Sequence, residues 1–582
     1  MNGQSIFEFD LFRLDPEQRR LSYAGSPVAL PPKTLDTLIV LVRNAGSLLR
    51  KDFLHQHLWA DAFVEDVTLA RSISDLRAAL NRCSAKQYIE TVSKYGYRFV
   101  AEVRSAPAAY SDATTNPASP SCEPTIAVLP FDVLGDDENL QVFGDGLAEE
   151  IIHFLSRITG LRVAARGSSF QFRNSAPDLR NIAARLGAAF ILHGSIRKSG
   201  HRLRVTAQLV QMNSFSVLWS EHIEREPGDF LEIQESIAQA IGRELCPRLG
   251  LPATALASSP RLPLMSAWHS CWEGRFHQHR FTPEGIARAE QCFKRAILAD
   301  PGYALPHVCL AENQHIKANL ALACPNEVLP KAHEAICKAL FLESASAEAH
   351  AAAGVNAVFW RYHWADAESH FHRALTLCPS SSSVRHLYAL WWLRPQGRLK
   401  EAIDENRIAL DLDPLSPFLR VVHAYFHYLA GNETEAIALC NVALAFEDRN
   451  YLAHRIIGHI FLREREKEKA HAAFAKAEII SGNSIVDSGY VAATEALLGD
   501  KARASRMSDN LRNARHDGYF PPTSVALLEA SLGRTEEACR WLRIALEEHD
   551  PNVLTISTDP IWNSLKHSNE YRYLIDRIGL RP

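Results

Sequence analysis

The alternation of apolar and polar side chains over the first hundred residues predicts a small sheet, three helices and a hairpin. Four short runs rich in β-forming residues lie within residues 6–30: IFEFD, FRL, RRLSY and SPVAL. Pro31 and Pro32 then open a helix that extends to about Asn44, and a second helix covers about residues 51–58. A third helix, over about residues 66–81, precedes YIETV, a turn at SKYG, and YRFVAEV, which together predict the hairpin.

The third predicted helix has two distinct faces. Its apolar residues recur at steps of four, three and four, and are Leu69, Ile73, Leu76 and Leu80. The opposite face carries Val67, Arg71, Ser74, Asp75 and Ala78, with Arg77 on the flank. Such a face can enter a DNA major groove, where Arg71 could pair with guanine and Asp75, despite phosphate repulsion, could accept from cytosine. From the helix alone, an ordinary amphipathic surface helix remains the other interpretation.

Residues 125–246 alternate between strand and helix patterns. TIAVLPF predicts a strand, GLAEEIIHFLSRI a helix, LRVAAR a strand and DLRNIAARLGA a helix. FILHGSIRK, RLRVTAQLV and SVLWSEHIE follow as a strand meander with a turn at Ser199 and Gly200, and a helix over residues 229–243 closes the segment. This order predicts a small α/β or α+β domain.

The last part of the chain repeats with a period of about 34 residues. Small residues recur at Ala367, Ala402, Ala436, Ala470, Ala504 and Ala538. A glycine stands five residues before four of these positions, whereas Arg465 stands where a fifth glycine is expected. Small residues let neighbouring helices pack closely, and the glycine ends the first helix of each pair. Seven or eight tetratricopeptide (TPR) repeats are predicted, with a capping helix in the final residues.

Two stretches rich in Ala, Ser and Pro predict flexible linkers at residues 105–124 and 247–263. They divide the chain into residues 1–104, 125–246 and 264–582. The element order of the first part is that of a winged helix. The predicted fold class is therefore a multidomain α+β protein with a winged helix, a small α/β middle domain and an all-α TPR solenoid.

Composition limits the possible functions without choosing one. The net charge is −4, so a nucleic-acid site must be local, and residues 67–98 supply six basic against two acidic side chains. No apolar run reaches the ~20 residues of a membrane span. The start, MNGQSIFEFDLF, lacks a signal-peptide pattern. Eleven scattered cysteines without a CxxC pair predict reduced thiols in a cytoplasmic protein rather than disulfides or a zinc site.

Three segments carry a resemblance to a known family: LPPKTLDTLIVLVRNAGSLLRKDFLHQHLW, VTLARSISDLRAAL and YIETVSKYGYRFVAEV. They resemble the OmpR/PhoB-type winged-helix family over nearly all of residues 6–103. The resemblance implies that the third helix reads double-stranded DNA and that Arg77 and Thr91 contact phosphates. It also implies that the loop from Trp59 to Glu65 meets RNA polymerase.

The wing of this family usually carries an arginine where the present chain has Ser93, so minor-groove contact is expected at Lys94 or not at all. The complete set of predicted DNA-contacting residues is Val67, Thr68, Arg71, Ser72, Ser74, Asp75, Arg77, Thr91, Lys94 and Tyr95.

The order of the parts refines the resemblance. Response regulators of this family carry a receiver domain ahead of the winged helix, whereas here the winged helix opens the sequence, so phosphotransfer is not the expected input. This order resembles that of the ToxR/CadC-like regulators. Because the linker is polar, the chain resembles the TPR-bearing, HilA-like members of that group. Residues 125–245 resemble TolB N-terminal-like/FlgO-like domains, which imply no chemistry.

Other candidate sites are weaker. Gly144, Asp145 and Gly146 lack the third glycine of a phosphate loop and are expected to start a helix. No metal or other cofactor is expected, because three i, i+2 histidine pairs point to different helix faces: His55 with His57, His277 with His279, and His370 with His372. Four tryptophans are expected on first helices of repeats, either in the core or lining a peptide groove: Trp360, Trp364, Trp391 and Trp392.

These features predict a soluble transcription regulator, an activator by resemblance, whose TPR array receives a protein or small-molecule signal or mediates self-association. The alternative is a TPR adaptor whose winged helix docks a protein instead of DNA. Asp75 and Ser93 motivate this alternative, since both depart from the strongest DNA-binding pattern. An enzyme is not predicted, because GxSxG, Walker A and HExxH motifs are absent from the sequence.

Overall fold

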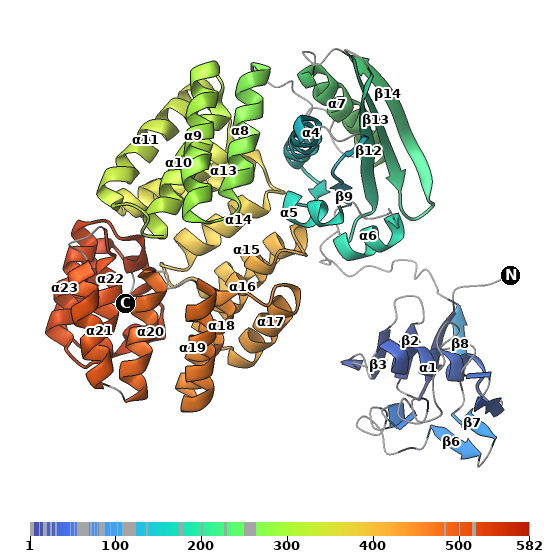
Figure 1. The fold of residues 1–582 in the computed structure, drawn as a ribbon. Coiled ribbons are helices and arrows are strands. Elements are labelled where there is room, and N and C mark those ends of the chain that lie inside the picture. The colour runs from blue at the N-terminus through green and yellow to red at the C-terminus, as the bar shows by residue number, and fades with distance from the viewer. Residues whose placement is uncertain are drawn as a thin grey trace. The chain divides into compact units, whose positions relative to one another are not determined.

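The structure is a computed structural model. It describes residues 5–10, 12–15, 20–23, 26–28, 32–46, 48–51, 53–54, 69, 73–74, 76–77, 80, 86, 88–92, 95–101, 103–107, 124–134, 138–173, 178–199, 202–225, 230–249, 263–481, 485–499, 501–514 and 519–580. Contacts divide the chain into two compact units, Met1–Pro120 and Ser121–Pro582 (Figure 1).

The first unit contains a five-stranded antiparallel sheet and a smaller three-stranded sheet. The larger sheet has the order β4-β3-β2-β1-β8 and consists of β1 (Ser5–Phe9), β2 (Phe12–Asp15), β3 (Arg20–Tyr23), β4 (Ser26–Val28) and β8 (Arg104–Pro107). The smaller sheet has the order β5-β7-β6 and consists of β5 (Leu48–Arg50), β6 (Ile89–Val92) and β7 (Gly96–Phe99). The four N-terminal strands and the hairpin confirm the sequence prediction, whereas β5 and β8 were not predicted.

Strand β8 corrects the start of the first predicted linker. Ser105 pairs with Phe7 and Pro107 pairs with Ser5, so residues 105–107 extend the sheet instead of leaving it. Proline is tolerated there because β8 is an edge strand, where a missing N–H group breaks no ladder bond. Residues 108–123, the rest of that linker, lie outside the described residues.

Helix α1 (Pro32–Arg43) and the third predicted helix close one core with both sheets. The four apolar residues of that third helix are each at most 1% exposed: Leu69, Ile73, Leu76 and Leu80. They pack in the same core as Leu38 and Phe99. The predicted inward stripe is therefore confirmed, and Ser74, the one residue of the predicted outward face that the structure describes, is exposed.

The second unit begins with a mixed sheet of order β11-β9-β12-β13-β14, with β10 paired to β12. Its strands are β9 (Thr125–Val128), β10 (Asp132–Leu134), β11 (Arg162–Val163), β12 (Phe190–Ser199), β13 (Arg202–Gln211) and β14 (Ser216–Arg225). One face packs against α4 (Glu138–Ser156) and α7 (Phe230–Arg248), and the other against α6 (Leu179–Leu186). Two short helical segments precede α6 in the chain, α5 (Arg166–Ser169) and η1 (Phe170–Phe172). The alternation matches the predicted α/β pattern, although α7 continues past the predicted linker start at residue 247.

The segment of Gly144, Asp145 and Gly146 lies inside α4, so the prediction that it starts a helix was wrong. The helix begins earlier, at Glu138, because the residues before Gly144 contribute buried apolar side chains such as Phe143. A Cβ atom on Gly146 would lie 2.2 Å from the ring of Trp268, so this glycine admits a tryptophan from another helix.

Eight helical hairpins follow among the described residues. They pair α8 (Met265–Gln278) with α9 (Pro283–Ala299), α10 (Ala304–Asn319) with α11 (Pro325–Leu342), α12 (Ala347–Asn356) and η4 (Ala357–Arg361) with α13 (Trp364–Leu377), α14 (Ser382–Tyr388) and η5 (Ala389–Leu393) with α15 (Leu399–Leu412), α16 (Pro417–Leu429) with α17 (Glu433–Phe446), α18 (Tyr451–Arg463) with α19 (Lys467–Ser481), α20 (Ile485–Leu498) with α21 (Lys501–Ala514), and α22 (Pro522–Ser531) with α23 (Thr535–Glu547).

The periodic small residues occupy the predicted positions between these helices. The six alanines are each 0% exposed: Ala367, Ala402, Ala436, Ala470, Ala504 and Ala538. Gly431 and Gly533 end first helices with φ of +82° and +79°. Arg465 holds the equivalent place with φ of +64°, so the left-handed turn is retained without a glycine.

Residues 551–580 return to repeats far earlier in the chain. They form η6 (Pro551–Thr555), η7 (Pro560–Leu565) and α24 (Asn569–Ile578). The indole N–H of Trp364 donates to the carbonyl of Ile578 at 2.6 Å, and Ser557 Oγ donates to the carbonyl of Pro395 at 2.8 Å. Trp562 is 1% exposed in the core that also contains Phe371. The predicted capping helix exists, but this segment packs against the second, third and fourth hairpins as well as the last one.

All four candidate groove tryptophans pack in or against this core: Trp392 is a buried member, and Trp360, Trp364 and Trp391 are partly buried against it. Trp364 begins α13, a second helix, rather than lying on a first helix as predicted. Trp392 is buried, and its indole N–H donates to the carbonyl of Trp364 at 2.9 Å. Trp360 and Trp391 are half-buried beside Arg361 and Arg394. For Trp364 and Trp392, therefore, the core interpretation is the one that the packing supports.

The α/β part and the repeats are packed into one unit. Trp268 and Trp272 of α8 belong to the core of the α/β sheet. Ser168 Oγ donates to Asp413 Oδ1 at 2.5 Å, and it accepts from the backbone N–H of Leu415 at 2.8 Å. The two segments that the sequence separates with a linker thus share an apolar core and buried hydrogen bonds.

Candidate nucleic-acid interface

The predicted DNA-contacting residues divide into two groups. Four of them are described by the structure: Ser74, Arg77, Thr91 and Tyr95. Six lie outside the described residues: Val67, Thr68, Arg71, Ser72, Asp75 and Lys94. The wing position Ser93 and the loop from Trp59 to Glu65 also lie outside them. The described part of the surface is therefore the flank of the third helix together with the hairpin of β6 and β7.

Arg77 connects the third helix to strand β6. Its Nη2 donates to the carbonyl of Ile89 at 2.9 Å and to Thr91 Oγ1 at 2.6 Å. Arg77 is half-buried and Thr91 is exposed, so the pair lies at the edge of the protein surface. The sequence indicated each residue as a phosphate contact but did not reveal that one bonds to the other.

This pairing leaves donors available on both residues. The two hydrogens of Nη2 are used, while Nε and Nη1 of Arg77 make no hydrogen bond to any described residue. Thr91 Oγ1 accepts from Arg77, so its own hydrogen can be donated elsewhere. Hydrogen bonds from a cation to an anion are the stronger kind, and a phosphate oxygen suits both donors.

The hairpin beside this pair is fixed by a glycine. Gly96 lies where β7 meets β5, and a Cβ atom on it would stand 1.9 Å from the carbonyl oxygen of Leu49. Tyr95 directly precedes it, is 60% exposed, and donates its backbone N–H to the carbonyl of Val92 at 3.0 Å. The close approach of β5 thus holds the hairpin, and with it Tyr95, against the body of the domain.

Two ion pairs partly neutralise the basic side chains of residues 67–98 that the structure describes. Arg98 Nη1 lies 3.3 Å from Glu90 Oε2, its cross-strand partner in the hairpin. Lys86 Nζ lies 2.7 Å from Asp10 Oδ1, and hydrogen bonds from Lys86 and Tyr88 lower the pKa of the Asp10 carboxyl. Asp10 lies outside the window in which the sequence counts six basic against two acidic residues. The carboxylate of Asp10 therefore offsets a positive charge of Lys86 that the sequence count leaves unopposed.

Two protein families match this chain. Residues 25–99 match the family described as "Transcriptional regulatory protein, C terminal". Residues 121–240 match "HilA/YgeH-like transcriptional regulator, second domain". With the first of these domains, the chain is a DNA-binding transcriptional regulator. The second match assigns the middle part to HilA-like proteins, and its resemblance to TolB N-terminal-like/FlgO-like domains stays a prediction.

Individual relatives share different extents of the chain. Transcriptional regulator HilA of Salmonella typhimurium is 25% identical over 439 residues, which are 74% of this chain and 75% of HilA. A Rhizobium meliloti protein named "Putative adenylate cyclase 3" is 31% identical over 189 residues, and the chain spans only about a third of it, 32%. Among solved structures, the DNA-binding domain of Escherichia coli CadC matches at 27% identity with a TM-score of 0.17, covering 18% of this chain and 98% of that domain.

The described residues also bear on the remaining candidate sites. His370 Nδ1 lies 3.0 Å from His350 Nδ1, whereas His372 faces Glu368, so the members of that pair do point apart. His, Cys, Asp and Glu side chains form no cluster of three suited to a metal ion within the part of the chain that the structure describes. Among the described helices, none has both the length and the apolar character that a bilayer crossing requires.

Proposed function

We propose that the first unit binds specific DNA sequences and that the third helix lies in the major groove. The observation that carries this proposal is the two-sided helix, whose apolar stripe from Leu69 to Leu80 is buried while Ser74 faces solvent. In this arrangement Arg71 pairs with guanine, which offers two acceptors to its fork. Val67, Thr68, Ser72 and Asp75 complete the helix contribution.

Arg77 and Thr91 are proposed to hold one phosphate of the DNA backbone. Their hydrogen bond of 2.6 Å presents a guanidinium and a hydroxyl side by side at the protein surface. Phosphate contacts fix the position of a protein on the duplex but do not read sequence. Lys94 and Tyr95 extend the contact through the wing.

The remaining parts of the proposal concern partners. We infer that the protein activates transcription through contact of the loop from Trp59 to Glu65 with RNA polymerase, and that it acts in the cytoplasm. The TPR array would receive a protein, peptide or small-molecule signal, or mediate self-association. No catalytic role is proposed, and nucleotide turnover by the full chain would contradict this part of the proposal.

Two arginine variants of the full chain test the proposal. Bound sequences are selected from a random duplex library, and affinities are then measured at several salt concentrations. Arg71→Ala should relax the preference at one base pair at a cost of about 1–3 kcal/mol. Arg77→Ala should weaken binding to all sequences and flatten the salt dependence by about one charge. Failure of the unsubstituted chain to select any sequence would favour the protein-docking adaptor instead.

A further inference from the structure

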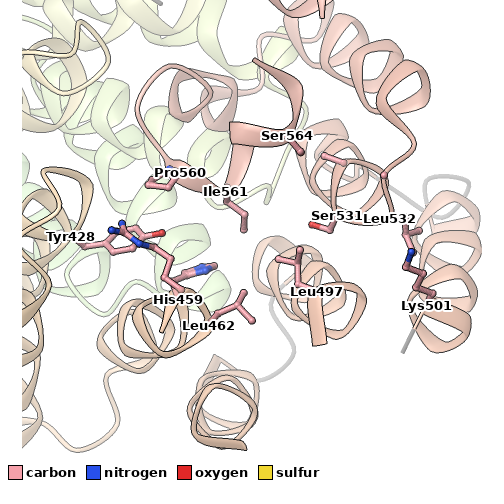
Figure 2. Close-up of a pocket in the computed structure, with 13 residues that line it drawn as sticks. Tyr428, His459, Leu462, Leu497, Lys501, Ser531, Leu532, Pro560, Ile561 and Ser564 are labelled. Carbon is pink, nitrogen blue, oxygen red and sulfur yellow. The ribbon is translucent and has the colours of Figure 1, made fainter. Parts of the chain in front are cut away.

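A pocket lies in the second unit between the last four helical hairpins and the C-terminal segment (Figure 2). Its volume is about 460 Å³, within the range of about 300–1,000 Å³ typical of small-molecule sites. Helix α18 supplies His459, Leu462 and Arg463 to its wall, and η7 supplies Ile561. The pocket is therefore formed jointly by the repeats and by the segment that folds back onto them.

One wall of the pocket is apolar. Leu462, Leu497 and Ile561 face the cavity from three different helical segments (Figure 2). Leu497 is 44% exposed. Covering this surface with an apolar ligand group would remove it from water, which is favourable.

His459 supplies an unsatisfied polar atom at the other side. It is 6% exposed and is surrounded by the rings of Tyr428, Phe474 and Tyr490, with centroids 6.1, 5.0 and 5.8 Å away. Burial lowers the pKa of its imidazole to about 3, so the ring is neutral. Its Nε2 is buried and has no hydrogen-bond partner among the described residues. A neutral imidazole can carry its hydrogen on Nε2 and donate it to a ligand.

The charges around the pocket favour an anion. The 13 residues that line it include Arg463 and Lys501 and no acidic residue. Arg463 uses Nε in an ion pair of 2.8 Å with Glu433, and Lys501 makes no ion pair with a described residue. Asp559, next to the wall, accepts from the backbone N–H of Ile561 at 3.1 Å, and burial raises the pKa of its carboxyl.

We propose that this pocket binds a small organic carboxylate that carries an apolar body. The carboxylate lies between His459 Nε2 and the guanidinium of Arg463, which are one turn apart on α18, and the apolar body covers Leu462, Leu497 and Ile561. Such a ligand would be the small-molecule signal of the proposed function, although its binding requires no DNA.

Isothermal titration calorimetry on the full chain tests the proposal. The probes are phenylpropionate, cyclohexanecarboxylate and naphthoate, each compared with its uncharged amide. At least one acid should bind about tenfold more tightly than its amide, because a charge-assisted hydrogen bond is replaced by a neutral one. Arg463→Gln should remove most of this preference. Arg540→Gln changes an arginine on α23 whose side chain is 73% exposed outside the pocket, and it should leave the preference intact.

His459→Phe provides the second variant, because it keeps an aromatic ring but removes Nε2. It should weaken acid binding about tenfold, with a thermal melt confirming that the variant is folded. Equal affinity for acid and amide, an unchanged preference in Arg463→Gln, or no binding of any acid at millimolar concentration would overturn the proposal. Sequence selection on DNA is measured separately, so failure of the DNA-binding proposal is distinguished from failure of this one.

Discussion

At the residue scale, Arg465 departs from the glycine of the repeat pattern, yet its backbone keeps the left-handed turn that the pattern predicts. The repeat predicts a glycine at this position, because the chain must turn out of a first helix. Arg465 nevertheless adopts φ of +64°, close to the +82° of Gly431 at the equivalent turn. A side chain with a Cβ atom pays a conformational penalty there that glycine avoids.

Arg465→Gly is therefore expected to stabilise the second unit by about 1 kcal/mol. Nine of the ten tryptophans lie in residues 121–582, so tryptophan fluorescence during denaturant unfolding reports on this unit. Gly431→Ala is the matched control and should destabilise by a similar amount. A lower denaturation midpoint for Arg465→Gly would show that its side chain contributes more than the strain costs.

The sequence predicted the residues whose role depends on periodicity. The buried alanines of the repeats and the inward leucines of the third helix both follow from spacing along one helix. The hydrogen bond between Arg77 and Thr91 could not be predicted in this way, because it depends on where the hairpin lies relative to that helix. The choice of Arg71 for base contact remains a prediction, since the residue lies outside the described part of the chain.

At the element scale, the sequence analysis missed two short strands of the first unit, β5 and β8. Strand β5 has three residues, and three residues contain too little alternation to distinguish a strand from a loop. Its existence is revealed by Gly96, because β5 and β7 approach so closely that only a hydrogen atom fits on that Cα atom. Strand β8 was missed for the related reason that its small residues resemble a linker.

Gly96→Ala should destabilise the first unit by at least about 1–3 kcal/mol, because the added methyl group forces β5 and β7 apart. Circular dichroism melts of the full chain should show a selective loss of the transition that belongs to the first unit, and DNA affinity should fall with it. Val100→Ala, four residues later at a position that is 45% exposed, should change stability by no more than about 0.5 kcal/mol. An unaltered melt for Gly96→Ala would mean that the strands tolerate a wider separation.

At the scale of the whole second unit, partly buried ionisable groups join the α/β part to the repeats. His153 Nδ1 of α4 lies 2.9 Å from Glu348 Oε1 of α12. The Glu348 carboxylate raises the pKa of His153 to about 9. Burial opposes ionisation of Glu348, but the charge and hydrogen bond of His153 outweigh it and lower its pKa to about 2. Nearby, burial raises the pKa of Glu312 to about 7.

These shifts predict a pH optimum for stability. Stabilisation from His153 is complete below its ordinary pKa of 6.5 and is lost as the pH rises through about 9. Protonated Glu312 adds stability that is lost between its ordinary 4.5 and about 7, and Glu348 loses its contribution below 4.5.

Burial lowers the pKa values of His279 and His459 to about 3 and that of His386 to about 4, so the second unit also loses stability as the pH falls below 6.5. The melting temperature of this unit should therefore be highest near pH 6.5 and fall toward pH 9. His153→Gln should abolish the fall above pH 7 but keep the part below it.

The linker predicted from the sequence divides the second unit into two domains, although these two parts pack together in the structure. A repeat array and an α/β domain each have their own periodicity, so sequence patterns separate them correctly. No pattern along the chain shows that Trp268 packs against Phe143 and Gly146, more than a hundred residues earlier, or that Ser168 bonds to Asp413. Such contacts depend on three-dimensional packing between segments that are distant in sequence.

The return of residues 551–580 to the early repeats has a consequence during protein synthesis. In an open solenoid each repeat contacts only its neighbours and can fold as soon as it leaves the ribosome. Here Trp364 and Phe371 share a core with Trp562 and Ile575, which are translated about 200 residues later. The early repeats must therefore wait with exposed apolar surface until translation of this region ends. The early repeats therefore fold late and together, rather than one after another during synthesis. Chaperone binding to the nascent chain should be greatest just before this step.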